Sequence, residues 1–122
     1  MTGKDTIVYI DDEELNVQLF ELLMAKKFNV LTGLSGAEGL NIVNENPLVK
    51  IVLSDLKMPG MNGLDFIKEA KTKFPDLLYF IFTGYDITSE INQLIEEGVL
   101  TGYFRKPFNI KEIELVLSKA LE

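Results

Sequence analysis

The sequence contains no cysteine and no histidine. Without cysteine there are no disulfide bonds and no thiolate metal ligands, and nothing in the composition indicates an oxidising compartment. Without histidine the chain lacks the commonest zinc ligand, the usual general base, and any serine–histidine or cysteine–histidine nucleophile pair. Any chemistry must therefore depend on carboxylates, lysine, hydroxyl groups and the backbone.

Long apolar runs and positive charge are also scarce. No apolar run approaches the roughly 18 residues that a membrane span needs, and the N-terminal stretch MTGKDTIVYIDDEE lacks the pattern of a secretory signal. We therefore expect a cytoplasmic protein without membrane association. The chain has 12 lysine and arginine residues against 19 aspartate and glutamate residues, a net charge of −7. This balance disfavours direct nucleic-acid binding, which needs a basic face.

Two local patterns alternate along the chain. Short runs rich in β-branched and aromatic residues, typical of strands, occupy 6–10, 28–34, 50–54, 77–83 and 102–106. Apolar residues at three- and four-residue steps, typical of amphipathic helices, occupy 14–27, 36–45, 63–74, 88–97 and 110–121. In the first of these helices the recurring apolar residues are Leu15, Leu19, Leu22 and Leu23, which we interpret as the apolar stripe of that helix.

Strand–helix alternation repeated five times predicts parallel strands joined by crossover helices. The expected fold class is therefore α/β, a doubly wound five-stranded parallel sheet in the order 2-1-3-4-5 flanked by five helices. The chain of 122 residues shows no linker and no low-complexity stretch. We expect residues 1–122 to form a single domain.

Polar and charged residues follow four of the predicted strands. The first strand ends in Asp11, Asp12, Glu13 and Glu14, the third in Asp55, the fourth in Thr83, and the fifth in Lys106-Pro107. Because ligands bind beyond the carboxyl ends of parallel strands, we expect these acids, the hydroxyl and the ammonium group to meet at one rim.

Such a rim is electrostatically costly without a ligand. Two carboxylates about 4 Å apart repel each other by about 4 kcal/mol at an effective dielectric constant of 20. Either one acid takes up a proton or a divalent cation holds the group together. For a cation, oxygen ligands without histidine or cysteine favour Mg²⁺. Lys106 and Thr83 would bind oxygens of a phosphoryl group, and Asp55 is the best-placed nucleophile because a carboxylate can form an acyl phosphate.

These residues resemble the motifs of bacterial two-component response-regulator receiver domains. The matching residues are Asp11-Asp12, Asp55 with the following MPGMNG, Thr83, and Lys106-Pro107-Phe108. The resemblance covers essentially the whole chain in order and spacing. It implies a flavodoxin-like phosphoacceptor domain of a phosphorelay, which assists its own phosphorylation and dephosphorylation but is not a conventional enzyme.

The resemblance also implies a role for each matching residue. Asp55 accepts a phosphoryl group from a histidine of a sensor kinase or histidine phosphotransfer protein. Mg²⁺ is held by Asp11, Asp12, Asp55 and the backbone carbonyl of Lys57. Thr83 and Lys106 bind phosphoryl oxygens, and the Lys106–Pro107 peptide bond is cis. Tyr103 occupies the family's aromatic switch position, and the surface of the fourth helix, fifth strand and fifth helix signals to a downstream protein or effector domain.

The resemblance further implies that two positions tune the lifetime of the phosphoryl group. They lie two residues after the acceptor aspartate, here Lys57, and two residues after the threonine, here Tyr85. A lysine and an aromatic ring at these positions would shield the phosphoryl group from water or steer it. We therefore expect slow self-dephosphorylation.

Each feature also has a simpler interpretation. Asp11 and Asp12 would suit the first turn of a helix, where the helix dipole favours acids. Asp55 would suit a turn, Thr83 the end of a strand, and Lys106 an exposed surface. An aromatic residue such as Tyr103 on an edge strand often serves packing alone.

Three other functions compete with the phosphoacceptor hypothesis. An interaction module that needs no phosphorylation would not require the acids, Thr83 and Lys106 together. In a flavodoxin-like electron carrier, DDEE after the first strand would repel the FMN phosphate. An aspartyl phosphohydrolase usually has a second aspartate two residues after the nucleophile, where this chain has Lys57. The sequence leaves open a homodimer and whether the domain stands alone or belongs to a longer regulator or hybrid kinase.

Overall fold

Five parallel strands form one sheet in the order β2-β1-β3-β4-β5. The computed structural model describes residues 3–84 and 87–122. The strands are β1 (Asp5–Ile10), β2 (Phe28–Gly33), β3 (Val49–Asp55), β4 (Leu78–Thr83) and β5 (Gly102–Arg105). The helices are α1 (Glu14–Met24), α2 (Gly36–Glu45), α3 (Gly63–Lys73), α4 (Ser89–Glu96) and α5 (Ile110–Ala120). The predicted fold class and strand order are confirmed.

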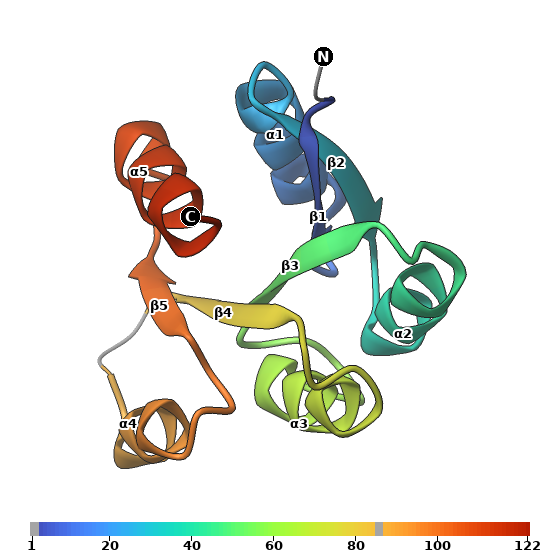
Figure 1. Cartoon of the computed structure of the whole chain (residues 1–122). Coiled ribbons are helices and arrows are strands. Elements are labelled where there is room, and N and C mark those ends of the chain that lie inside the picture. The colour runs from blue at the N-terminus through green and yellow to red at the C-terminus, as the bar shows by residue number, and fades with distance from the viewer. Residues whose placement is uncertain (1–2, 85–86) are drawn as a thin grey trace.

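Helices cover both faces of the sheet. Helices α1 and α5 lie on one face, and α2, α3 and α4 lie on the other (Figure 1). Successive residues of a strand point to opposite faces, so Val8 and Ile10 pack with the second group of helices while Ile7 and Tyr9 pack with the first. The central strands β1 and β3 are therefore buried on both sides, which explains their nearly continuous apolar sequences.

The leucine stripe predicted for the first helix faces solvent, not the core. Leu15 and Leu22 are 79% and 76% exposed, and Leu19 and Leu23 are 45% and 37% exposed. The buried residues of α1 are instead Val17, Phe20 and Met24. This helix carries apolar residues on two faces, so periodicity alone could not identify the inner one. The inner face of α1 is set by Phe20, whose ring stacks on that of Tyr9 with ring centroids 4.3 Å apart.

Side-chain caps fix where α2, α3, α4 and α5 begin, and the cap of α4 is Thr88. Ser35 accepts a hydrogen bond from the backbone N–H of Glu38 at 3.1 Å, and Asn109 accepts one from Glu112 at 3.1 Å. Asn62 caps α3 by accepting from the backbone N–H of Asp65 at 2.9 Å. Each cap satisfies one of the backbone donors left without an intrahelical partner. The cap at Asn62 also sets the length of the loop between Asp55 and α3.

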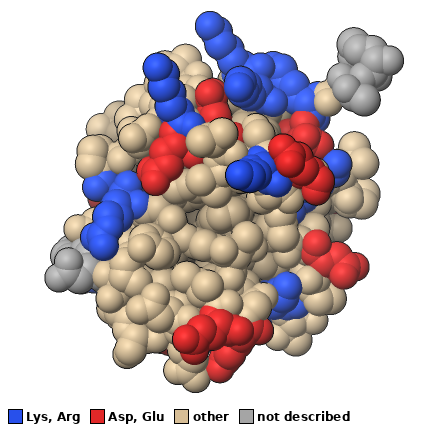
Figure 2. Space-filling model, turned by 60° about the vertical axis from the view of Figure 1, so that its left-hand side comes forward, with Lys and Arg blue, Asp and Glu red and all other residues tan. Residues whose placement is uncertain are grey.

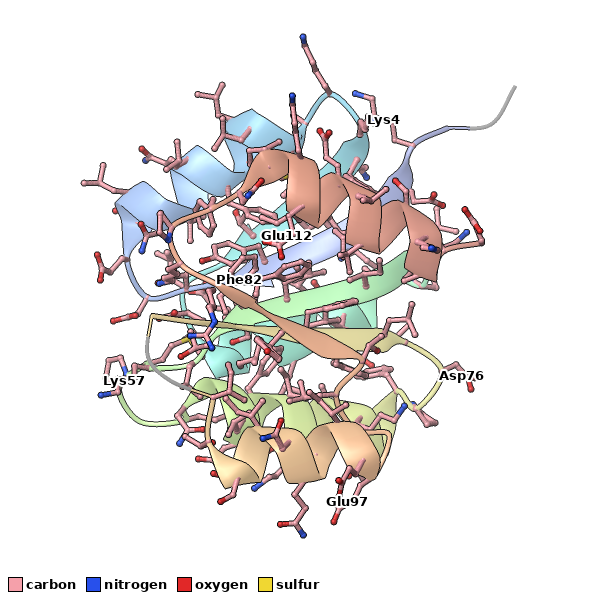
Figure 3. All side chains as sticks on the ribbon, turned by 90° about the vertical axis from the view of Figure 1, so that its left-hand side faces the viewer. Lys4, Lys57, Asp76, Phe82, Glu97 and Glu112 are labelled. Atoms are coloured by element: carbon pink, nitrogen blue, oxygen red, sulfur yellow. The ribbon has the colours of Figure 1, made fainter. Side chains whose placement is uncertain are left out.

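Within the described ranges, no helix is long and apolar enough to cross a membrane. The carboxyl ends of all five strands lie at one end of the sheet, as the parallel order requires. Lys57, which follows β3, lies at this end, and Asp76, which precedes β4, lies at the other (Figure 3).

Candidate functional site

Strand register brings the predicted site residues together. Ile10 pairs with Ser54, so Asp11 and Asp55 are the next residues along β1 and β3. Thr83 is the last residue of β4 and pairs with Arg105, directly before Lys106. Asp11, Asp55, Thr83 and Lys106 therefore lie close together at the carboxyl ends of neighbouring strands.

Asp11 is fully buried and bound through both carboxylate oxygens. Oδ1 accepts a hydrogen bond from the backbone N–H of Glu13 at 3.0 Å, and Oδ2 accepts one from the Tyr9 hydroxyl at 2.7 Å. The ammonium group of Lys106 lies 3.5 Å from the same Oδ2. These contacts provide hydrogen-bonding partners for a carboxyl group that is removed from water.

Asp55 forms the closest ion pair of the site. Its Oδ1 lies 2.7 Å from Nζ of Lys106, and the residue is 8% exposed. Asp55 and Lys106 also line a cleft of about 350 Å³ together with Glu13, Leu56, Lys57 and Gly84. A ligand entering the cleft would therefore meet a carboxylate and an ammonium group in its lining.

Three carboxylates form a candidate metal site. Asp11, Asp12 and Asp55 each offer an oxygen, and these oxygens lie within 4.8 Å of one another. The set contains only oxygen donors, which suits a hard divalent cation. Asp12 is exposed while Asp11 is fully buried, so the cluster is open to solvent on one side. The residues present therefore fit a metal that keeps some of its water ligands.

The charges of the site perturb both members of its ion pair. Burial raises the pKa of Asp55 above its usual value, and the negative charges of Asp11 and Asp12 act in the same direction, against the hydrogen bond from Lys106. Burial acts to lower the pKa of Lys106, but the hydrogen bond to Asp55 and the charges of both acids outweigh it and raise that pKa. Without a bound metal ion, negative charge is thus in excess around Asp55.

Thr83 and Lys106 are connected through the backbone. The N–H of Lys106 donates to the carbonyl of Thr83 at 2.9 Å, and Thr83 itself is 1% exposed. The Lys106–Pro107 peptide bond is cis. The hydroxyl-bearing end of β4 and the lysine-bearing end of β5 are therefore held next to each other.

The loop after Asp55 folds back onto the strand that it leaves. The N–H of Gly63 donates to the carbonyl of Leu56 at 2.9 Å, and Gly60 has a φ of 76°, which favours glycine. Lys57 is exposed and lines the cleft. The turn that the sequence predicts thus brings this loop to the same rim as the acids.

The two predicted tyrosine positions have different outcomes. Tyr103 lies on β5, pairs with Ile81, and is 38% exposed. Because Ile81 and Thr83 are two residues apart on β4, Tyr103 lies on the sheet face to which Thr83 points. Tyr85 lies outside the described residues.

Sequence reasoning missed the contact between Tyr9 and Asp11. These residues are two apart on one strand, so their side chains point to the same face. A tyrosine placed two residues before the first acid was therefore the available signal. Burial and the hydrogen bond to Asp11 raise the pKa of Tyr9 far above its usual range, so its hydroxyl keeps its proton and donates.

We expect the Asp55→Asn variant to be more stable than the wild type in metal-free buffer at pH 7. The raised pKa means that the folded wild type binds a proton at Asp55 more tightly than the unfolded chain does. This contribution to stability is complete below about pH 4 and is lost as pH rises through the folded pKa. Asparagine is neutral throughout, and its side-chain oxygen can still accept from Lys106.

Urea unfolding of both proteins in EDTA between pH 3.5 and 8 measures this effect. The difference in unfolding free energy should be largest at neutral pH and shrink toward pH 3.5. A difference that is independent of pH would show that ionisation of Asp55 does not cause it.

The geometry agrees with comparisons to known proteins. A family model described as response regulator receiver domain matches residues 7–118. The chain is 32% identical to sporulation initiation phosphotransferase F of Bacillus subtilis (strain 168) over 119 residues, which cover 96% of this chain and 94% of that protein. It is 28% identical to the hydrogenase transcriptional regulatory protein HoxA of Cupriavidus necator over 103 residues, 84% of this chain. The match spans only 21% of the length of HoxA.

Solved structures agree with the same assignment. A response regulator receiver domain protein from Clostridium thermocellum superimposes with a TM-score of 0.83 at 30% identity, covering 94% of this chain and 92% of that one. The shared fold, the matched residues and the cluster of acids at the strand ends lead to one assignment. The chain belongs to the response regulator receiver domain family, the signalling domains of two-component systems.

Proposed function

We propose that this chain is a phosphoacceptor switch that takes a phosphoryl group onto Asp55 from a phosphohistidine of a sensor kinase or phosphotransfer protein. The observation that carries the proposal is the arrangement around Asp55. An ammonium group lies 2.7 Å from its carboxylate, and oxygens of three aspartates lie within 4.8 Å of one another. The chain has no histidine of its own, so the donor imidazole would come from the partner.

In the proposed transfer step, Asp55 is the nucleophile. A carboxylate oxygen attacks phosphorus as the bond from phosphorus to the histidine nitrogen breaks, and the nitrogen leaves with the bonding electron pair. The other ring nitrogen of the phosphohistidine carries a proton during transfer, so the products are an acyl phosphate on Asp55 and a neutral imidazole on the donor. Asp55 suits this role because it lies in the cleft, whereas Asp11 is fully buried and both of its oxygens accept hydrogen bonds.

We assign Mg²⁺ to the carboxylates of Asp11, Asp12 and Asp55 and to the backbone carbonyl of Lys57. A bound Mg²⁺ neutralises charge on the phosphoryl oxygens during transfer. Lys106 and Thr83 are assigned to the remaining oxygens because both lie at the strand ends next to Asp55. Lys57 lines the cleft beside Asp55, which supports a part for its side chain in setting the phosphoryl lifetime.

Phosphorylation would change the surface made of α4, β5 and α5. A phosphoryl group adds about −1.5 to −2 charges next to Asp55, and this charge attracts Lys106 and Thr83. Their backbone link passes the movement to β5, where Tyr103 is partly exposed. Figure 2 turns this side of the molecule toward the viewer and shows a largely uncharged centre above the acidic side chains at its lower edge. We assign the contact with a downstream protein or effector domain to this surface.

An intact-mass measurement tests the proposed function. The wild type is incubated with a small-molecule phosphodonor in the presence of Mg²⁺ or of EDTA. We expect a gain of one phosphoryl group with Mg²⁺ and none with EDTA. No gain with Mg²⁺ on a folded protein would favour the alternative of an interaction module that needs no phosphorylation.

Two exposed leucines of α1, Leu15 and Leu19, lie near the rim of the site and suit a protein phosphodonor. Leu15 is in the first turn of α1, directly after the acids of the rim, and is 79% exposed. Leu19 borders a mainly apolar depression together with Asn16, Lys106, Pro107 and Phe108. A protein that brings its phosphohistidine to Asp55 must cover this rim. We therefore assign the docking of the histidine-bearing donor to the leucine face of α1.

We predict that Leu15→Ala slows phosphoryl transfer from a protein donor but not from a small phosphodonor. Loss of an apolar contact in an interface commonly costs about 1–2 kcal/mol, which corresponds to a five- to thirtyfold decrease in transfer rate. The measurement compares both donors, using an autophosphorylated histidine kinase that phosphorylates the wild type. Leu48→Ala is the matched control, because Leu48 is 77% exposed but precedes β3 at the far end of the sheet. Equal slowing by both variants would contradict the assignment.

A further inference from the structure

The hydroxyl of Tyr9 is a buried polar group aimed at one acid of the proposed metal site. Tyr9 is fully buried on β1, and its hydroxyl donates to Oδ2 of Asp11 at 2.7 Å. Its ring stacks on Phe20 and meets the edges of Phe82 and Phe108 at centroid distances of 5.5 and 5.8 Å. These contacts leave the hydroxyl little freedom, so the position of its proton is fixed relative to Asp11.

Two donors share the same carboxylate oxygen of Asp11. The Tyr9 hydroxyl lies 2.7 Å from Oδ2, and the ammonium group of Lys106 lies 3.5 Å from it. Lys106 is meanwhile 2.7 Å from Asp55. If the hydroxyl were absent, the ammonium group of Lys106 would remain as a donor to Oδ2. An ion pair between a carboxylate and an ammonium group tightens when a competing donor is removed, because the buried charge must be satisfied.

We infer that Tyr9 is a positioning residue of the metal site, which orients Asp11 toward a divalent cation and keeps it from closing onto Lys106. This inference rests on the proposed function, since it concerns the same Mg²⁺ site. The hydroxyl satisfies Oδ2 without bringing in a positive charge that would compete with the cation. It also leaves Lys106 paired with Asp55, where the phosphoryl group is to be received. Hydrogen bonds to metal-binding side chains commonly contribute ten- to a hundredfold to metal affinity.

Tyr9→Phe isolates the hydroxyl from the rest of the side chain. Phenylalanine keeps the ring and its aromatic neighbours and removes one hydrogen bond. The chain also offers a matched control in Tyr79, which is fully buried and whose hydroxyl donates to the carbonyl of Phe74 at 2.7 Å. Tyr79→Phe removes the same chemical group and an equally short hydrogen bond from β4, at a distance from the acids.

The experiment is an NMR titration of the unphosphorylated full chain with Mg²⁺, which follows the backbone amides of Asp12 and Asp55. We expect the Mg²⁺ dissociation constant of Tyr9→Phe to rise about tenfold over the wild type and that of Tyr79→Phe to remain unchanged. Urea unfolding of both variants in EDTA shows how far each is destabilised. A loss of affinity in Tyr9→Phe alone cannot come from general destabilisation that both variants share.

Two results would overturn the inference while leaving the proposed function intact: wild-type affinity in Tyr9→Phe, or an equal loss of affinity in both variants. A wild type whose amides do not respond to Mg²⁺ would overturn the proposed metal site and this inference with it. If Tyr9→Phe does not fold, the test is an NMR titration of the wild type that follows its labelled tyrosine rings. The Tyr9 ring resonances should shift at saturating Mg²⁺ and those of Tyr79 should not, and an unmoved Tyr9 ring would contradict the inference.

Discussion

Asparagine in place of Asp55 is expected to abolish the gain of a phosphoryl group from a small phosphodonor, a decrease in rate of more than about a thousandfold. The amide has nearly the same shape as the carboxylate but no negative oxygen to attack phosphorus. Its oxygen can still accept from Lys106, which lies 2.7 Å from Oδ1 of Asp55. The variant therefore removes the nucleophile and retains its surroundings.

The neighbouring acids are not expected to replace the missing nucleophile. Both oxygens of Asp11 accept hydrogen bonds, and the residue is fully buried. Asp12 is exposed. The shortest ion pair of Lys106 is made with Asp55, not with Asp12. A phosphoryl gain in Asp55→Asn that matched the wild type would move the acceptor to one of these two acids.

Intact mass followed over time, with Mg²⁺ present, measures the loss. Asp76→Asn is the control, because Asp76 is exposed and lies at the opposite end of the sheet (Figure 3). It makes the same chemical change and should leave the reaction as it is in the wild type. Since metal-free Asp55→Asn is expected to be more stable than the wild type at pH 7, unfolding cannot account for its loss of reaction.

The sequence was sufficient to predict the fold and the composition of the rim. Strands of a parallel sheet must end at one edge, so the order of strands and helices alone brings Asp11, Asp55, Thr83 and Lys106 together. The expected strand order is the one observed. These features follow from periodicity and topology, which every residue of an element helps to define.

The sequence could not predict which face of α1 packs against the sheet, because that depends on which of its two apolar faces fits better. Helix α1 has apolar residues on two faces, and the inner face is set by the fit of Phe20 against Tyr9, which no spacing rule contains. The contact between Tyr9 and Asp11 is different, because residues two apart on a strand point to the same face and the sequence therefore carries a signal for it. The spacing does not contain the hydrogen bond itself, which depends on how both side chains pack in three dimensions.

Gly63 is another residue whose importance appears only in the folded chain, and Gly63→Ala should cost about 3 kcal/mol of unfolding free energy. An added Cβ would overlap the backbone carbonyl oxygen of Asp55 and would lie 2.7 Å from Cδ1 of Ile81. The backbone of a central strand cannot rotate away as a side chain can. The loop must then move outward, which weakens the hydrogen bond from the N–H of Gly63 to Leu56.

Gly36→Ala provides the matched comparison, because Gly36 begins α2 as Gly63 begins α3. A Cβ at Gly36 would meet Sδ of Met61 at 2.7 Å, and this flexible side chain can turn aside. We expect a change within about 1 kcal/mol, since alanine is the better helix former by a similar amount. Urea unfolding at pH 7 in EDTA compares the two variants with the wild type, and equal midpoints would contradict the overlap at Asp55. Because the overlapped oxygen belongs to Asp55 itself, the displacement should also slow phosphorylation of the folded fraction. Gly63 would then be needed for the position of the acceptor as well as for stability.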